Sequence, residues 1–138
     1  MNNHFTHWRD VPEGMWKWPN FTPEEMADRK SGALFFVPEF MDLLQTLRTK
    51  LGFPLPINSA YRTLDHDRAI GGANVHPSGE AVDIGIWGER AYHLIRLAPA
   101  MGFAGIGIKQ RGPYKGRFVH LDTLDDDDHP RPRIWSYR

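Results

Sequence analysis

The sequence has no cysteine among its 138 residues. This absence excludes disulfide bonds, thiolate zinc sites, iron–sulfur clusters and a cysteine nucleophile. It does not by itself indicate a cellular compartment. Any metal ion that the protein binds must therefore be held by histidine, carboxylate or backbone oxygen.

An excess of charge is also lacking, because 17 lysine and arginine residues balance 17 aspartate and glutamate residues. Surfaces that bind nucleic acid or anionic membranes usually carry an excess of basic residues. We therefore expect no nucleic-acid partner.

Long apolar runs are missing as well. A signal peptide needs a basic start and then an apolar run, whereas residues 1–20 are polar, aromatic and interrupted by proline. The longest mainly apolar stretch, residues 91–108, contains His93, Arg96 and Gly102, so we expect no insertion into a membrane. These absences predict synthesis in the cytoplasm without an export signal.

The length suits one domain over residues 1–138, with residues 1–20 as an extended amino-terminal arm. No internal repeat or long linker divides the sequence. We expect this domain to be a monomer.

The order of the expected elements indicates the fold class. Apolar residues recur at steps of three and four before Gly52, and Thr22 with Glu25 forms a capping-box pattern. We expect helices over residues 22–30, 38–51 and 89–101, helical turns within 63–70, and strands over 55–61, 81–87, 104–109 and 117–122. Because helices come first and most strands later, this order favours an α+β domain with an antiparallel or mixed sheet flanked by helices.

Several well-known catalytic motifs do not occur. The sequence has no His-Glu-x-x-His, no Gly-x-Ser-x-Gly and no phosphate-binding loop. Residues 105–107 (Gly-Ile-Gly) lack the third glycine of a dinucleotide-binding loop. The chemistry must therefore come from another arrangement of residues.

One candidate arrangement is the octet of residues 76–83 (His-Pro-Ser-Gly-Glu-Ala-Val-Asp). His76 on a loop and Asp83 on a strand can converge on one cation if Gly79 permits the turn between them. The alternative is that the two side chains share no ligand, and the spacing alone does not decide, because it recurs at His120 and Asp127.

A second candidate is the strand of residues 117–122. Side chains alternate along a strand, so His120 and Asp122 share one face, opposite the apolar strip of Val119 and Leu121. A solvent-facing polar edge is the alternative interpretation. Arg62, which follows the strand at 55–61, belongs either to a functional pocket or to a surface turn with an ion pair to Asp65 or Asp67.

Taken together, four segments resemble a known family in order and spacing. They are residues 58–62 (Asn-Ser-Ala-Tyr-Arg), 66–73 (His-Asp-Arg-Ala-Ile-Gly-Gly-Ala), the octet 76–83 and 118–122 (Phe-Val-His-Leu-Asp). The family is the zinc D-alanyl-D-alanine carboxypeptidases and related L-alanyl-D-glutamate endopeptidases of bacteria and phages. The resemblance covers roughly residues 20–137 and implies the fold that these peptidases share with the Hedgehog signalling domain.

The resemblance implies a zinc cofactor. Its ligands would be His76, Asp83 and His120, with water in an open position, which is the ligand set of a catalytic zinc. Such a zinc lowers the pKa of the bound water and polarises the scissile carbonyl.

The resemblance also implies a substrate pocket. Arg62 is expected to hold a substrate carboxylate, a role that suits a planar guanidinium. Ser59 and Tyr61 are expected to line the same pocket.

The sequence departs from the family pattern at two places. Asn74 stands where family members usually have serine, and Arg117 and Phe118 occupy the usual positions of the general base. Asp122 is then the local candidate for a catalytic residue, since alternation places it on the ligand face. Its alternative role is to orient a ligand histidine through the other ring nitrogen.

The carboxyl-terminal residues are interpreted as structural. The acidic run of residues 125–128 is expected to be a solvated loop, answered by Arg131, Arg133 and Arg138. Trp135 is expected to pack over the core.

The function that the resemblance implies is zinc-dependent hydrolysis of a peptide bond in the stem peptide of bacterial peptidoglycan, by a D-Ala-D-Ala carboxypeptidase or a murein endopeptidase. We expect a phage setting, either as an endolysin that reaches the cell wall after release or as a virion component. The alternative is a catalytically impaired, zinc-stabilised binding or structural module, which the residues at the base positions favour.

Overall fold

The computed structural model describes residues 3–138. The helices are α1 (Pro23–Met26), α2 (Pro38–Leu51), α3 (Leu64–Ala69) and α4 (Gly88–Met101), with short 3₁₀ turns at Trp8–Asp10, His76–Ser78 and Tyr114–Gly116. The strands are β1 (His4–Phe5), β2 (Leu34–Phe35), β3 (Ile57–Ser59), β4 (Ala81–Ile84), β5 (Gly105–Lys109), β6 (Phe118–Asp122) and β7 (Arg133–Ser136).

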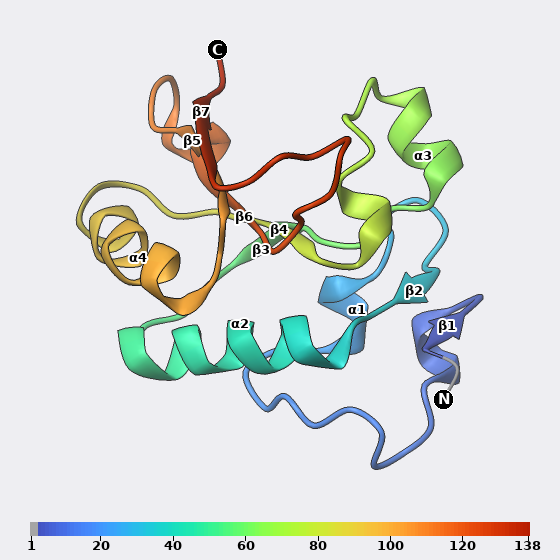
Figure 1. The fold of residues 1–138 in the computed structure, drawn as a ribbon. Coiled ribbons are helices and arrows are strands. Elements are labelled where there is room, and N and C mark those ends of the chain that lie inside the picture. The colour runs from blue at the N-terminus through green and yellow to red at the C-terminus, as the bar shows by residue number, and fades with distance from the viewer. Residues whose placement is uncertain (1–2) are drawn as a thin grey trace.

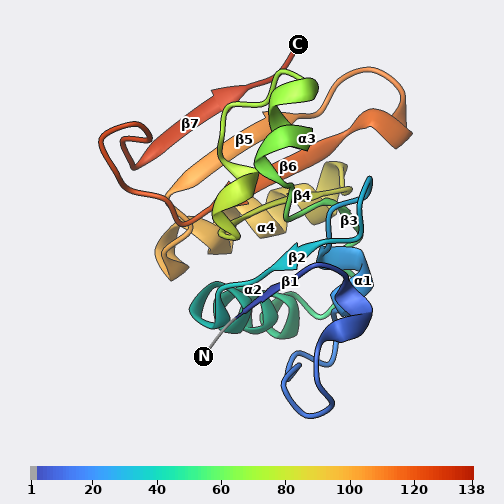
Figure 2. The same ribbon diagram turned by 90° about the vertical axis from the view of Figure 1, so that its right-hand side faces the viewer.

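The larger sheet contains five strands in the order β3-β4-β6-β5-β7. Its neighbours pair antiparallel except β5 and β7, which run parallel. In Figure 1 the helices α2 and α4 lie on one side of this sheet and α3 lies on the other, and Figure 2 shows α3 in front of the strands with α4 behind them. The expected α+β fold with a mixed sheet and flanking helices is confirmed.

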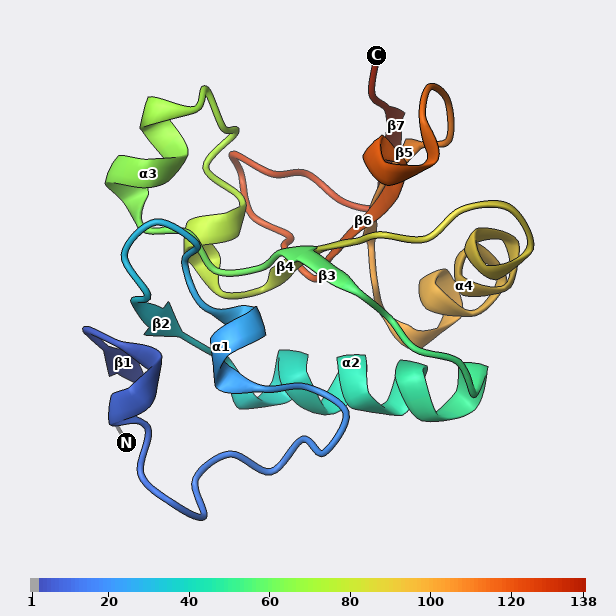
Figure 3. The same cartoon turned by 180° about the vertical axis from the view of Figure 1, so that it is seen from behind.

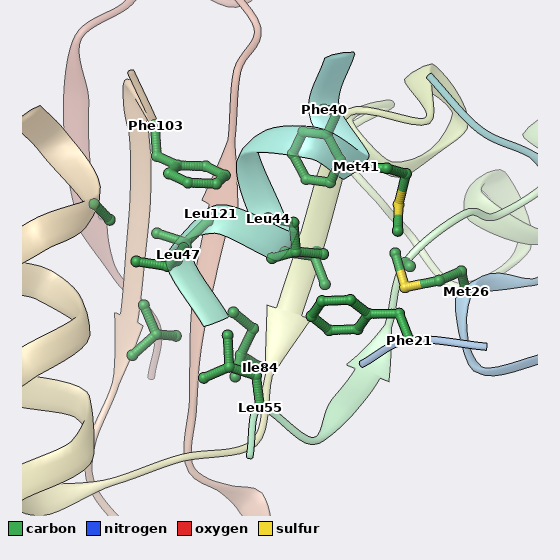
Figure 4. Close-up of a cluster of buried hydrophobic side chains, with 14 of the residues drawn as sticks. Phe21, Met26, Phe40, Met41, Leu44, Leu47, Leu55, Ile84, Phe103 and Leu121 are labelled. Carbon is green, nitrogen blue, oxygen red and sulfur yellow. The ribbon is translucent and has the colours of Figure 1, made fainter. Parts of the chain in front are cut away.

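The core lies between the sheet and the two long helices. Alternate residues of the central strands, among them Val82, Ile84 and Leu121, are buried on this face. Leu44 and Leu47 of α2 belong to the same buried cluster, and Figure 4 shows both of them together with Ile84 and Leu121. Because strand side chains alternate, the intervening residues of β4 and β6 face the opposite side, towards α3.

The end of helix α2 agrees with the sequence prediction, whereas helix α1 ends earlier than predicted. Helix α2 has the predicted bounds and ends at Gly52, whose backbone is left-handed with φ of 75°. Helix α1 ends at Met26 rather than near residue 30. The carboxylate of Asp28 accepts hydrogen bonds from the backbone N–H groups of Lys30 and Ser31, which turns the chain out of the helix.

The amino-terminal segment packs against the body. Strand β1 pairs antiparallel with β2, and both lie together in Figure 3. The indole Nε1–H of Trp18 donates a hydrogen bond to Asp42 of α2, and the rings of Trp16 and Phe36 meet edge to face. No helix within residues 3–138 combines the length and the apolar character that crossing a membrane requires.

Candidate metal centre

Three side chains that are distant in sequence meet at the sheet face opposite the long helices. His76 opens the 3₁₀ turn before β4, Asp83 lies in β4, and His120 lies in β6 directly opposite Asp83 in the strand register. One potential ligand atom from each residue lies within 4.8 Å of the other two. The sheet register and the turn together bring the predicted ligands to one point.

The orientation of His76 is fixed by a backbone carbonyl. Its Nδ1 lies 2.6 Å from the carbonyl oxygen of Ala60. A carbonyl only accepts, so Nδ1 donates this hydrogen bond and Nε2 is directed into the site, 3.3 Å from Oδ2 of Asp83. Gly79 makes the turn with φ of 73°, and a Cβ there would lie 2.8 Å from the ring of Phe35. Gly79 therefore permits the turn that brings His76 and Asp83 together, as expected from the sequence.

His120 is oriented by Asp122. Its Nε2 lies 2.8 Å from Oδ2 of Asp122, whereas its Nδ1 lies 2.8 Å from Oδ1 of Asp83. The carboxylate of Asp122 also accepts from Arg131, at 2.9 Å from Nε and 2.8 Å from Nη2. His120 and Asp122 are 2% and 0% exposed, so this chain of hydrogen bonds is shielded from water.

The carboxyl groups of the site are held in their ionised form. Burial raises the pKa of Asp122, but hydrogen bonds from His120 and Arg131 outweigh it and lower that pKa to about 2. Burial likewise raises the pKa of Asp83, and hydrogen bonds with His120 and His76 hold it well below its usual range. Ionised carboxylates are the form that binds a metal ion.

The donor set fits zinc. The group offers one nitrogen from each of two imidazoles and a carboxylate oxygen, which are ordinary zinc ligands. Three protein ligands leave a coordination position for water or substrate, as in catalytic zinc sites, whereas structural sites are usually closed by four. Asp122 behind His120 matches the carboxylate–histidine–metal pattern that orients such ligands.

The three residues open into a cavity of about 570 Å³, called here the main cavity. Its lining residues are Arg62, Gly71, Gly72, Ala73, Val75, His76, Asp83, Phe118, His120, Asp128, His129, Arg131, Arg133, Trp135 and Tyr137. Arg62 therefore lies in the same cavity as the three candidate ligands. Ser59, Tyr61 and Asp122 are not part of this lining.

Arg62 is held on several sides. Its Nε donates to Oγ of Ser59 at 3.1 Å, and its Nη1 lies 2.9 Å from Oδ1 of Asp67. Its Nη2 is 3.7 Å from Oδ2 of Asp83. The ion pair with Asp67, one of the alternatives from the sequence, is present, and Ser59 contacts Arg62 rather than the cavity.

Tyr61 lies in a neighbouring hollow with Leu64 and Pro77. Its backbone N–H donates to the carbonyl of Met26, and its ring centroid is 6.2 Å from that of Phe35. The structure does not bring Tyr61 into the main cavity.

The residues that depart from the family pattern serve other purposes. Asn74 has a left-handed backbone with φ of 62°, and its N–H donates to Asp67 at 2.9 Å. Phe118 lines the main cavity, whereas Arg117 donates to the carbonyl of Gly112 and places its guanidinium over the ring of Tyr114. Neither residue supplies a general base.

Sequence reasoning missed the contribution of the carboxyl-terminal strand. Arg133, Trp135 and Tyr137 line the cavity, and the Trp135 ring centroid lies 5.3 Å from that of His120. A Cβ at Gly107 of β5 would lie 2.6 Å from Trp135 and from Tyr137, so that glycine makes room for both rings. The alternation of the three cavity residues at steps of two was the signal for this strand.

Sequence reasoning also missed the direct partner of Arg131. The sequence suggested that it answers the acidic run of residues 125–128, and the charges of Asp125 and Asp126 do act on it, but its direct partner is Asp122, with which its guanidinium forms two hydrogen bonds. These two residues are separated by a loop, and no periodicity connects them.

Comparison with known proteins agrees with this geometry. A family model described as Peptidase M15 matches residues 19–122, which is most of the chain and includes all three candidate ligands. No curated protein sequence gives a significant match. The peptidases of this family depend on zinc, and the His-Asp-His group is positioned to hold such an ion. The chain therefore belongs to the peptidase M15 family.

Proposed function

We propose that this protein hydrolyses a peptide bond in the stem peptide of bacterial peptidoglycan. The observation that supports this proposal most directly is the convergence of His76, Asp83 and His120 within 4.8 Å at a cavity that also contains Arg62. In the proposed site these three residues hold zinc, which when bound polarises the scissile carbonyl and activates water.

The protein side chains would orient the ligands and the substrate. Ala60 fixes the ring of His76 through its carbonyl, and Asp122 fixes the ring of His120. Arg62 would bind a substrate carboxylate through Nη2, the nitrogen left without a short hydrogen bond to residues 3–138. Ser59 would hold Arg62 in place, and Tyr61, from the adjoining hollow, would contact a more distant part of the substrate.

For Asp122 we favour the role of a positioning residue over that of a general base. Its carboxylate is fully buried and both oxygens accept hydrogen bonds. A base must reach the water from which it takes a proton, and the described lining of the main cavity does not include Asp122.

The binding or structural module remains the second candidate. Arg117 and Phe118, at the usual base positions, cannot accept a proton at neutral pH.

We further propose that residues 1–138 act as one domain, and that this domain works on the cell wall as a phage endolysin or as part of a virion.

The test is product analysis after incubation of the zinc-loaded protein with purified peptidoglycan. Free D-alanine would indicate carboxypeptidase activity, whereas new amino groups without D-alanine would indicate an endopeptidase. His76→Ala and His120→Ala should lose zinc and activity, and His93→Ala, on α4 and outside the cavity lining, is the matched control. If the protein binds zinc but releases no product from any type of peptidoglycan, the peptidase proposal fails and the binding or structural module is the remaining candidate.

A further inference from the structure

Strand β7 forms one wall of the main cavity. It pairs in parallel with β5, with Trp135 opposite Gly107 and Arg133 opposite Gly105. Arg133, Trp135 and Tyr137 alternate along the chain, so they project to one face, and all three line the cavity. This wall lies outside residues 19–122, the part that the family model matches.

The three arginines of the cavity differ in how their charge is compensated. Arg62 is paired with Asp67 at 2.9 Å, and Arg131 is paired with Asp122 at 2.8 Å. Arg133 forms no ion pair within residues 3–138. Its guanidinium carbon lies over the ring of Trp135, 6.0 Å from the ring centroid.

The acidic residues of the lining leave Arg133 available. Asp83 faces the two candidate ligand histidines, and Asp128 forms no ion pair with Arg133. A guanidinium at the wall of a cavity, with no protein carboxylate beside it, is suited to bind a carboxylate of a ligand in a forked geometry. The neighbouring rings of Trp135 and Tyr137 offer apolar area for the chain that carries this carboxylate.

We propose that Arg133 is a specificity-determining residue that binds a second carboxylate of the substrate peptide, separate from the one assigned to Arg62. The ligand is a peptide with two carboxylates, and Trp135 and Tyr137 pack against the segment next to the second one. This inference rests on the proposed function, because it names the substrate class of the same site.

The test uses the zinc-loaded protein and synthetic stem peptides in which each carboxyl group in turn is converted to the carboxamide. Where the peptides are hydrolysed, the readout is the ratio of kcat/KM for acid and amide. Where none is hydrolysed, it is the ratio of the Kd values from calorimetry on the same protein. A failure of the proposed function is therefore seen separately from a failure of the carboxylate site.

For one of the carboxyl groups, the wild-type protein should prefer the peptide acid over the carboxamide by about 10- to 100-fold in kcat/KM or Kd, the range for a charge-assisted hydrogen bond. Arg133→Gln should bring that ratio close to one while the zinc content stays unchanged, and Arg133→Lys should restore part of it. Arg111→Gln, an exposed arginine outside the cavity lining, should keep the wild-type ratio. No discrimination by the wild type, or full discrimination by Arg133→Gln, would overturn the proposal.

Discussion

Both carboxylate oxygens of Asp122 accept hydrogen bonds from Arg131, at 2.9 Å from Nε and 2.8 Å from Nη2. The same carboxylate accepts from His120, so a guanidinium on the loop before β7 is linked to a candidate zinc ligand on β6. The Arg131 side chain is only 4% exposed, so water screens the ion pair between Arg131 and Asp122 only weakly. The link makes the orientation of His120 depend on the carboxyl-terminal segment.

Asp122→Asn should lower the zinc affinity by about 10- to 100-fold, the usual effect of removing a partner that orients a metal ligand. The amide cannot accept from both His120 and Arg131 with the same strength. Competition with a chromogenic chelator measures the effect, and Asp126→Asn, on an exposed loop, is the control. An unchanged affinity would show that Asp122 does not position His120.

Arg131→Met should destabilise the metal-free protein by about 3–5 kcal/mol, because it leaves the buried carboxylate of Asp122 without its cation. Urea unfolding measures this free energy. Arg133→Met, at an exposed position of β7, should change it by less than about 0.5 kcal/mol.

The double variant with Asp122→Asn and Arg131→Met should lose less stability than the sum of the two single changes, since the charge left unpaired by one change is removed by the other. Additive losses would mean that the two residues are not coupled.

Gly107→Ala should destabilise the protein by about 1–3 kcal/mol, as expected for overpacking. The added Cβ would lie 2.6 Å from the rings of Trp135 and Tyr137. Gly116→Ala is the control, because its nearest neighbour, Nζ of Lys109, is 4.0 Å away. Thermal or urea unfolding compares the two, and equal effects would show that β7 does not pack closely on β5.

Acid should destabilise the protein partly through Asp28. Burial raises its pKa, but hydrogen bonds from the backbone of Thr63 and Ser31 and from the His66 ring outweigh it, and the pKa falls from 3.8 to about 2. A pKa lowered by folding stabilises the native state above pH 3.8, and this contribution is lost as the pH falls towards about 2.

The contribution of Asp28 is about 2 kcal/mol. Between about pH 6 and about pH 2, wild type should therefore lose up to about 2 kcal/mol more than Asp28→Asn in urea unfolding. Wild type and Asp28→Asn both retain Asp83 and Asp122, so the titration of these two groups cancels when the two losses of stability are compared. Parallel losses would contradict the assignment to Asp28.

The fold was largely predictable from local patterns. Helix α2 follows from its apolar spacing and Gly52, and β6 follows from the alternation around His120. Both patterns are local in sequence, and each places the apolar side chains on one face of its element, which then packs in the core. The early end of α1 was not predicted because it depends on a side chain, Asp28, that bonds to the backbone beyond the helix.

The candidate site was predictable where motifs mark it and not elsewhere. His76, Asp83 and His120 were found from motif order, and the structure brings them together. Arg131 lies in a loop and Arg133 begins the parallel edge strand β7 after Pro132, and the surroundings of both side chains are set by tertiary contacts. The match to the peptidase M15 family ends at residue 122, before either residue.

We propose that this M15 peptidase uses zinc to hydrolyse cell-wall peptides, and titration of zinc into the metal-free protein tests this, with hydrolysis of purified peptidoglycan followed as new amino groups. We expect no hydrolysis without zinc, and a rate that rises with added zinc and saturates at about one zinc per chain. Hydrolysis by the metal-free protein, or saturation with zinc and no hydrolysis of any wall type, would contradict it.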